Sequence, residues 1–247
     1  MPYKEVKFIT GGFYHLILRA IDNNLLFKNT DDYYRGVFSI YEFNNASPVS
    51  IRNRRKARAA FKTAYRGRDS VSTEGLVIEP DKRDKLVEVM SFCLMPNHVH
   101  LLARQIKDGG IIKFMSKIGG GYGGYFNRKY KRKGYVFQDR FERVLIKNDN
   151  QLRIVFVYIH ANPLSLIEPG WKELGIKNPE KAQSFLEKKY KWFSYPDFIG
   201  GKSFPSVTDR DFLLDVMGGE ERCKNAENDW IYHKAKIAKF SDIFLDF

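Results

Sequence analysis

Apolar and polar residues alternate along several short stretches of the chain, which is the pattern of half-buried β-strands. The first stretch is FYHLILRA at 13–20, and KLVEVMSFCLM at 85–95 and HVHLLARQ at 98–105 follow later. The turn pair Pro96-Asn97 separates the last two stretches, so we predict that they form a β-hairpin. One more strand is expected within YVFQDRFERVLI at 135–146.

Two other stretches have the spacing of amphipathic helices. DDYYRGVFSIYEF at 31–43 begins with acidic residues and then places apolar residues on one face. NQLRIVFVYIHAN at 150–162 follows Asn148 or Asp149, either of which can cap a helix. Pro163 disfavours helical geometry at the residue before it, so this helix is expected to end there.

A further helix is expected from Gly110, but its sequence is unusual. KIGGGYGGYF at 117–126 contains five glycines, and each weakens a helix by about 1 kcal/mol relative to alanine. We predict a break between two helices at this point. A glycine-rich stretch can also let a phosphate backbone approach closely, and this alternative stays open.

The order strand, helix, hairpin, helix, strand predicts an α+β sandwich, with a mainly antiparallel sheet packed by helices on one side. A polar segment at about 46–80 is predicted to be a surface insertion, partly helical over 51–65. We assign one domain to 1–198. Residues 199–247 form a C-terminal extension of unknown role, with a short helix near Asp211–Met217 and a polar tail.

Composition adds a functional indication to this outline. The 247 residues include 42 Lys and Arg against 29 Asp and Glu, a formal net charge of +13. Such an excess favours a polyanionic partner, although some basic proteins have none. We see no long basic amphipathic helix with a clean apolar stripe, so nucleic acid is expected rather than a membrane surface.

The cysteine content and the length of the apolar runs indicate the cellular compartment. Cys93 and Cys223 are too few and too far apart for a disulfide framework or a cysteine zinc site. The N-terminus lacks the apolar core of a signal peptide, and no apolar run approaches the roughly 20 residues that span a membrane. We therefore expect a cytoplasmic protein.

Candidate chemistry begins with two histidines in CLMPNHVHLL at 93–102. On a strand, His98 and His100 point to the same face, about 6–7 Å apart at the backbone, while Val99 points to the core. Two imidazoles at that spacing can bind one divalent metal, although two histidines can also share a face by chance. The pair is two ligands short of a closed zinc site, so an open, partly hydrated site is expected.

A metal beside nucleic acid suggests phosphoryl chemistry and therefore a nucleophile. Tyr158 lies on the flank of the apolar stripe of helix 150–162, and Asn162 follows one turn later on the same flank. A flank position is expected to let the phenol reach the sheet without being sealed in the core. Asn162 offers an amide oxygen as a third ligand for Mg²⁺ or Mn²⁺. Tyrosine on its own is a weak candidate, because the chain has 14.

Several further residues are candidates for binding nucleic acid. His15 and Arg19 share a face of the first strand and are expected to contact phosphate or line the site, with a core hydrogen bond as the alternative for His15. Basic residues alternate with aromatic ones at 125–133, a pattern that suits single strands, or else a solvated helix end whose aromatic residues fill the core. The candidates for nucleic-acid contact, some of which ordinary surface pairing would equally explain, are Arg19, Arg54, Arg55, Lys129, Lys131, Arg132, Lys133, Gln138, Arg140 and Arg143.

These segments together resemble a known family, the single-tyrosine HUH (His-hydrophobic-His) transposases, and in particular the REP-associated tyrosine transposases. CLMPNHVHLL resembles the family's histidine motif, and YIHANPL resembles its tyrosine helix. FYHLILRAIDNNLLFKNTDDYYRGV, YFNRKYKRKGYVFQDRFERVLI and KYKWFSYPDF are similar to its other segments, in the same order. The resemblance covers about 8–45 and 86–198. The insertion at 46–80 and the number of glycines at 119–124 depart from it.

The resemblance implies a ferredoxin-like, HUH-type sandwich and a specific chemistry. It makes His98 and His100 ligands of Mg²⁺ or Mn²⁺, makes Tyr158 the nucleophile, and puts Asn162 where some relatives carry a glutamine ligand. Family members cut single-stranded DNA beside imperfect hairpins, form a 5′-phosphotyrosine and leave a free 3′-hydroxyl. Some relatives work as homodimers, and REP-associated relatives can work as monomers. The resemblance also implies a bacterial-type, nucleoid-associated protein in the cytoplasm.

Two alternatives to a transposase stay open at this stage. A domesticated relative could bind hairpin nucleic acid without cutting it, and its binding would be indifferent to a chelator. A metal-dependent hydrolase could cut with water and release DNA that carries no attached protein.

Overall fold

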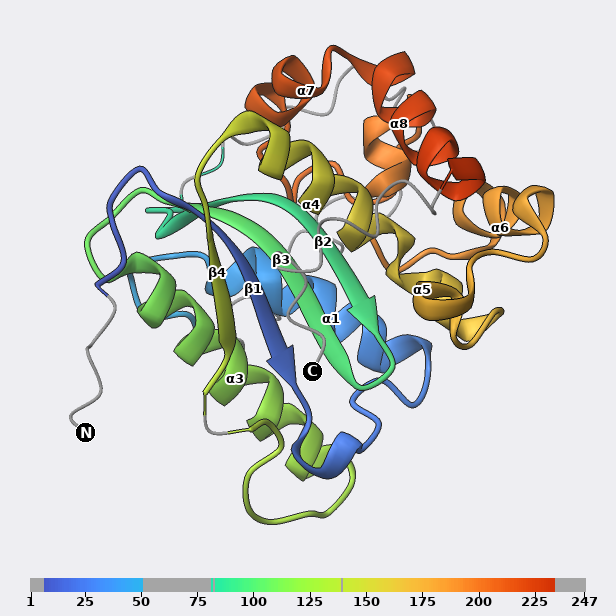
Figure 1. Cartoon of the computed structure of the whole chain (residues 1–247). Helices are drawn as coiled ribbons and strands as arrows, with labels where there is room; N and C mark the ends of the chain where they lie inside the picture. The colour runs from blue at the N-terminus through green and yellow to red at the C-terminus, as the bar shows by residue number, and fades with distance from the viewer. Residues whose placement is uncertain (1–6, 51–80, 82, 139, 234–247) are drawn as a thin grey trace, which may run out of the picture.

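The computed structural model describes residues 7–50, 81, 83–138 and 140–233. Within them, four strands form one antiparallel sheet in the order β2-β3-β1-β4 (Figure 1). The strands are β1 (Phe13–Arg19), β2 (Val87–Met95), β3 (His98–Gln105) and β4 (Glu142–Ile146). This confirms the predicted α+β class, the antiparallel sheet and the hairpin at Pro96-Asn97.

Helices follow the strands along the chain and cover the sheet. They are α1 (Thr30–Phe43), α3 (Gly110–Lys129), α4 (Asp149–Ala161), α5 (Trp171–Leu174), α6 (Pro179–Ser184), α7 (Asp211–Met217) and α8 (Glu220–His233). Short 3₁₀ turns occupy Ile21–Asn23, Asn162–Leu166 and Tyr195–Phe198, and a π-turn occupies Phe185–Lys189.

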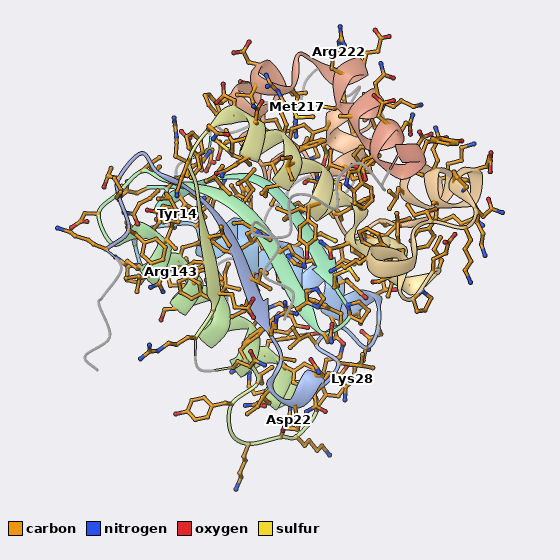
Figure 2. The ribbon with its side chains drawn as sticks, viewed as in Figure 1. Tyr14, Asp22, Lys28, Arg143, Met217 and Arg222 are labelled. Atoms are coloured by element: carbon orange, nitrogen blue, oxygen red, sulfur yellow. The ribbon has the colours of Figure 1, made fainter. Side chains whose placement is uncertain are left out.

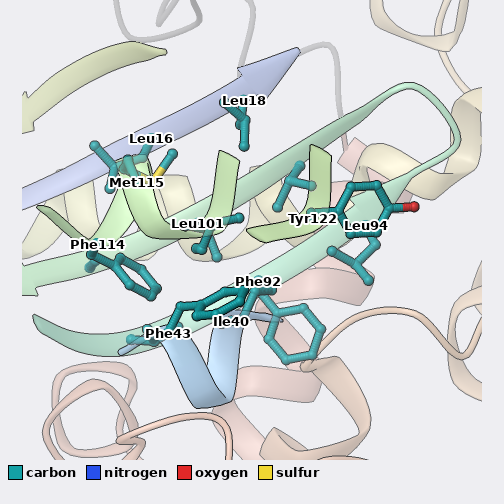
Figure 3. Close-up of a cluster of buried hydrophobic side chains, with 14 of the residues drawn as sticks. Leu16, Leu18, Ile40, Phe43, Phe92, Leu94, Leu101, Phe114, Met115 and Tyr122 are labelled. Carbon is teal, nitrogen blue, oxygen red and sulfur yellow. The ribbon is translucent and has the colours of Figure 1, made fainter. Parts of the chain in front are cut away.

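The two faces of the sheet are covered by different helices. Helices α1 and α3 pack on one face, where Leu16, Leu18 and Leu101 lie in a fully apolar layer (Figure 3). Helix α4 packs on the opposite face, against β2 and β3 (Figure 1). The prediction of helices on one side only is therefore wrong. The nearly continuous apolar sequence of β2 agrees with burial on both faces.

The C-terminal helices complete the second layer. Leu213 of α7 and Cys223 and Trp230 of α8 are buried in one cluster with Phe156 and Ile159 of α4. Met217 and Arg222 mark this end of the molecule, opposite Asp22 and Lys28 (Figure 2). Helices α7 and α8 thus belong to the core behind α4. The domain boundary at 198 stays a prediction.

The predicted break in the glycine-rich helix is wrong, because α3 runs unbroken over Gly110–Lys129. A Cβ on Gly121 would lie 2.1 Å from the ring of Phe43 in α1. The glycine therefore lets α1 and α3 approach closely. Packing of this helix on the sheet and on α1 offsets the weak helix propensity of its glycines.

Helix α4 begins and ends as its sequence predicts. The Asn148 side chain accepts a hydrogen bond from the Gln151 backbone N–H, at 3.0 Å, and so caps the first turn. The α-helix ends at Ala161, two residues before Pro163, and a 3₁₀ turn continues the chain. These local signals hold the helix in register, and with it the position of Tyr158.

The aromatic segment KWFSYPDF at 191–198 covers the edge of β2 that does not pair with β3. The Leu94 backbone N–H donates to the Trp192 carbonyl at 2.8 Å, and the Ser194 N–H donates to the Phe92 carbonyl at 3.0 Å. The edge strand therefore has partners on both sides. Most of the predicted insertion at 46–80, including Arg54 and Arg55, lies outside the described residues.

Candidate active site

The strand alternation puts the two histidines of β3 on the face that α4 covers. On β1, Arg19 lies directly opposite His98, and Ile17 lies opposite His100. Because directly opposed residues of an antiparallel pair share a face, His15 and Arg19 belong to the same surface as the histidine pair. The two predicted pairs, His98 with His100 and His15 with Arg19, each share a face as expected, and the register of β1 and β3 puts both pairs on the same face.

Each histidine of the pair has its Nδ1 engaged by a neighbouring side chain. His98 Nδ1 lies 2.6 Å from Asn97 Oδ1, which is an acceptor, so this nitrogen donates. His100 Nδ1 lies 2.9 Å from His15 Nε2 in a fully buried contact. In the tautomer that carries its hydrogen on Nδ1, each imidazole keeps a lone pair on Nε2, as second-shell partners arrange for metal-binding histidines.

The burial of these imidazoles favours their neutral form. Burial, with the charges of Arg19 and Lys172, lowers the pKa of His98 and of His15 to about 3. Burial also holds the pKa of His100 well below its usual range. Neutral imidazole is the form that binds metal ions.

A divalent metal at this site would need donor atoms from the histidine pair and its neighbours. His100 is fully buried, and its Nε2 has no hydrogen-bond partner among the described residues, which is unusual for a buried polar atom. His98 and His100 together offer two Nε2 atoms, with ring centroids 4.7 Å apart. The part of the chain that the structure describes contains no group of three or more His, Cys, Asp and Glu residues able to hold a metal. The site therefore fits a metal that takes two imidazoles and completes its shell with oxygen ligands.

Tyr158 of α4 lies directly against these histidines. Its ring centroid is 5.8 Å from that of His100 and 5.7 Å from that of His15, both edge to face. The side chain is only 3% exposed, so the expectation that the phenol avoids the core is wrong. The reason is that α5 and the C-terminal helices close over α4.

The side chains of Asn162 and Lys172 each form a hydrogen bond with Tyr158. Asn162, one turn later, donates from Nδ2 to the Tyr158 backbone carbonyl at 2.8 Å. Lys172 of α5 donates from Nζ to the Tyr158 hydroxyl oxygen at 3.1 Å. Burial raises the pKa of the phenol, while the Arg19 charge and the Asn162 side chain oppose that shift. The structure thus brings Asn162 to the nucleophile candidate, and its role as a metal ligand stays a prediction.

Two residues of this cluster were missed by reasoning from sequence. Asn97 was assigned only to the turn, although its position directly before His98 made it a candidate for orienting that ring. Lys172 follows Tyr158 by fourteen residues in an irregular segment and has no local signal. Only the folded chain brings it to the phenol.

Arg19 is held at the edge of the cluster by an acidic neighbour. Its Nε donates to Glu142 Oε1 of β4 at 2.7 Å, and the side chains are 19% and 34% exposed. This guanidinium is therefore partly neutralised and fixed beside His98. Its predicted contact with DNA phosphate stays a prediction.

The basic-aromatic sequence at the end of α3 has a structural role in part. Lys129 forms an ion pair with the fully buried Asp32 of α1 at 2.6 Å. The hydroxyls of Tyr125 and Tyr130 donate to the same carboxylate, and Phe126 is buried in the core. These contacts support the core alternative for Lys129 and the aromatic residues of this stretch.

The loop that follows α3, unlike the end of that helix, has basic side chains exposed to solvent. Lys131 and Lys133 are exposed, and Tyr135 between the loop and β4 is 83% exposed. The loop returns to the sheet where the Gln138 N–H donates to the Arg19 carbonyl at 3.0 Å. Arg132 lies over the Phe126 ring. Arg143 of β4, labelled in Figure 2, lies over the Phe8 ring. Gln138 and Arg140 are exposed beside the loop.

His160 does not belong to the site. It lies between Tyr158 and Asn162 in sequence, but its Nε2 lies 2.9 Å from Ser194 Oγ, on the segment that borders β2. Phe156, Phe193 and Phe198 surround the ring. Leaving it out of the candidate site agrees with this structural position.

A comparison with family models identifies proteins that are similar to part of this chain. Residues 71–162 match the family model described as "Transposase IS200 like". Over this range the chain is similar to IS200-like transposases. The matched range includes His98, His100, Tyr158 and Asn162, and leaves β1, α1 and everything after Asn162 outside.

Other comparisons add little to the IS200-like assignment. A solved structure titled "Structure of the REP associates tyrosine transposase bound to a REP hairpin" is similar, with 15% identity over 85% of this chain and 96% of that chain. Its TM-score of 0.42 is too low to carry a conclusion about this chain. None of the curated proteins matches the sequence. Among the described residues, no helix has the length and apolarity needed to span a membrane.

Proposed function

We propose that this chain is a metal-dependent, single-tyrosine HUH transposase that cuts and rejoins single-stranded DNA beside hairpins. The observation that carries the proposal is the meeting of Tyr158 with the histidine pair. The Tyr158 and His100 rings are 5.8 Å apart, although they come from a helix and a strand more than fifty residues apart in sequence. The IS200-like family match over both residues supports the same function.

The proposed reaction begins with the phenol of Tyr158. Its oxygen attacks a DNA phosphorus, and the bond from phosphorus to the 3′ oxygen breaks. The proton lost by the phenol ends on the released 3′-hydroxyl, and the DNA segment on the 3′ side of the cut stays on the enzyme, joined through its 5′ phosphate as a phosphotyrosine. Because this linkage conserves the energy of the cut bond, a 3′-hydroxyl can reverse the step without another energy source.

His98, His100 and the amide oxygen of Asn162 would hold the divalent metal, Mg²⁺ or Mn²⁺. Such a metal, when bound, polarises the phosphoryl oxygen and neutralises charge in the transition state. Asn97 and His15 keep the two imidazoles oriented with Nε2 toward this position. The ring of Tyr158 lies edge to face on those of His15 and His100, next to this position.

The positively charged loop after α3 is the proposed path for the DNA strand. Lys131 and Lys133 are exposed there, and the chain after them is hydrogen-bonded to Arg19, opposite His98. Lysine side chains neutralise phosphates without reading sequence. The strand would thus be led toward the histidine end of the sheet.

A covalent-adduct assay tests the proposal. Single-stranded DNA with a hairpin, labelled on its 3′ segment, is incubated with the protein and Mg²⁺ or Mn²⁺. The proposal predicts an adduct that survives SDS, is lost on adding EDTA, and is absent in Tyr158→Phe. An adduct that persists in Tyr158→Phe would show that another residue is the nucleophile. Product released without attached protein would indicate a hydrolase.

A non-cleaving hairpin-binding protein is the second candidate, and one observation favours it. The phenol is 3% exposed and its hydroxyl is already engaged by Lys172. A protein that only binds would need no access to this oxygen. Salt-sensitive binding of hairpin DNA with no adduct under any metal condition would support this candidate over the first.

A further inference from the structure

Lys172 is the one ammonium group in the described residues that touches the hydroxyl of Tyr158. Its Nζ lies 3.1 Å from the phenol oxygen and 5.1 Å from the centre of the phenol ring. It lies in α5, after the range that the IS200-like family model covers.

The fold holds this lysine in place through its neighbour. Trp171 is almost fully buried and packs edge to face on Trp230 of α8, with ring centroids 4.9 Å apart. Lys172 also lies 5.8 Å from the Trp171 ring. The C-terminal helix therefore supports the turn of chain that carries Lys172 to the active site. This contact gives the C-terminal extension a physical link to the chemistry.

We propose that Lys172 is a catalytic residue, whose ammonium stabilises negative charge on the Tyr158 oxygen as its bond to phosphorus forms and breaks. The inference rests on the proposed function, because it deepens the role of the same nucleophile. A phenol sealed from water cannot have its charge stabilised by solvent. A donor already in contact with the oxygen replaces that solvent and needs no rearrangement during the reaction.

The chemistry balances with Lys172 charged throughout. In cutting, the Tyr158 oxygen gains its bond to phosphorus, the 3′ oxygen loses its bond, and the phenol proton ends on the 3′-hydroxyl. In rejoining, the 3′-hydroxyl attacks phosphorus, the phosphotyrosine bond breaks, and the proton returns to the phenol oxygen. Negative charge on the Tyr158 oxygen appears in both directions, so Lys172 accelerates both.

The inference is tested on the full-length protein with the hairpin substrate and Mn²⁺. Lys172→Met removes the ammonium and keeps a similar side-chain length. Lys172→Arg keeps a positive donor, and Lys177→Met is the matched control because Lys177 is exposed on the same segment. The measurements are the rates of adduct formation and of rejoining, the Mn²⁺ affinity by electron paramagnetic resonance, and the melting temperature.

Lys172→Met is expected to slow both cutting and rejoining by about 10²-fold, the usual effect of losing one such donor. Mn²⁺ affinity and melting temperature should stay at wild-type values, Lys172→Arg should recover a large part of the rate, and Lys177→Met should behave as wild type. In Lys172→Cys, treatment with 2-bromoethylamine should restore activity by rebuilding the ammonium. Cys93 and Cys223 are fully buried and so shielded from the reagent.

Three results would overturn the inference. Wild-type rates in Lys172→Met would show that the contact has no part in the reaction, while leaving the transposase proposal intact. A loss of Mn²⁺ affinity or of melting temperature in parallel with the rate would assign Lys172 to metal binding or to the fold. A wild-type protein that forms no adduct at all would remove the proposed function and the inference with it.

Discussion

The two faces of the sheet are built from the same strands but have different content. On the face under α1 and α3, Leu16, Leu18 and Leu101 form an apolar layer. On the face under α4, the alternate positions of β1 and β3 carry His15, Arg19, His98 and His100 at one end. Helices cover both faces, so the two faces differ in the polarity of their side chains and not in their burial.

This contrast separates stability from function. Apolar burial stabilises the fold, whereas a buried polar atom without a partner costs about 1–3 kcal/mol. The orphaned Nε2 of His100 therefore lowers stability where a leucine would raise it. A fold that keeps such an atom beneath a helix is consistent with a site that binds something there.

The largest expected effect comes from two adjacent residues on opposite faces. His100→Leu should abolish metal binding and DNA cutting, but lower the free energy of unfolding by no more than about 1–3 kcal/mol, the cost of leaving His15 unpaired. Leu101→Ala should lower that free energy by about 2–5 kcal/mol, with cutting per folded molecule retained. Calorimetric Mn²⁺ titration, urea unfolding and the adduct assay together measure these effects. Equal losses in both variants would end the distinction between the faces.

A second prediction concerns the apolar face at the contact between α1 and α3. Gly121→Ala should lower the free energy of unfolding by about 1–3 kcal/mol, because its Cβ would clash with Phe43. Gly120→Ala is the matched control, since nothing lies within 4 Å of its Cβ position. It should raise the free energy of unfolding by about 1 kcal/mol through helix propensity. Urea unfolding distinguishes them, and stabilisation by both would contradict the close approach.

A third prediction concerns a buried acid behind α4. Glu227 of α8 is 1% exposed, its carboxyl oxygens have no hydrogen-bond partner within the described part of the chain, and burial raises its pKa well above the usual range. Between the unfolded pKa near 4.3 and the raised folded pKa, only the folded state holds this proton. Stability therefore falls as pH rises through that window.

Glu227→Gln should remove that fall and raise the free energy of unfolding at pH 8 by about 1–3 kcal/mol. Chemical unfolding between pH 5 and 8 measures it, at fixed ionic strength. A variant with the same slope against pH as the wild type would show that Glu227 is solvated in the folded protein.

The smallest expected effect is on DNA affinity. Lys133→Ala should weaken binding of single-stranded hairpin DNA uniformly across sequences and lower the salt slope of log K by about 0.7, as for one lost phosphate contact. Lys188→Ala, at an exposed lysine outside the loop, is the control. Fluorescence anisotropy at several salt concentrations gives both slopes. Equal slopes in Lys133→Ala and the wild type would move the DNA path away from the loop.

Much of the sheet was predictable because its signals are local. The alternation in β1 and β3, the Pro96-Asn97 turn and the Asn148 cap each act within a few residues. They also sufficed to put His98 and His100 on one face and Tyr158 in a helix. The contact between that helix and that face was expected from the family resemblance rather than from periodicity.

Features that depend on distant packing were not predictable. The break expected in α3 is absent because Phe43, more than seventy residues away in sequence, packs at Gly121. The second helical layer was missed because it depends on how Leu213 and Trp230 dock behind α4. The contact between Lys172 and Tyr158 depends on the same packing, so no local sequence pattern predicts this contact.

Anomalous diffraction from crystals grown with Mn²⁺ tests the central claim most directly. The account predicts one Mn²⁺ peak bonded to the Nε2 atoms of His98 and His100, with the Tyr158 oxygen facing the ion's open side. In His100→Leu crystals the peak should disappear while α4 keeps its place. A peak elsewhere in the molecule, or no peak between these two imidazoles at saturating Mn²⁺, would contradict the account.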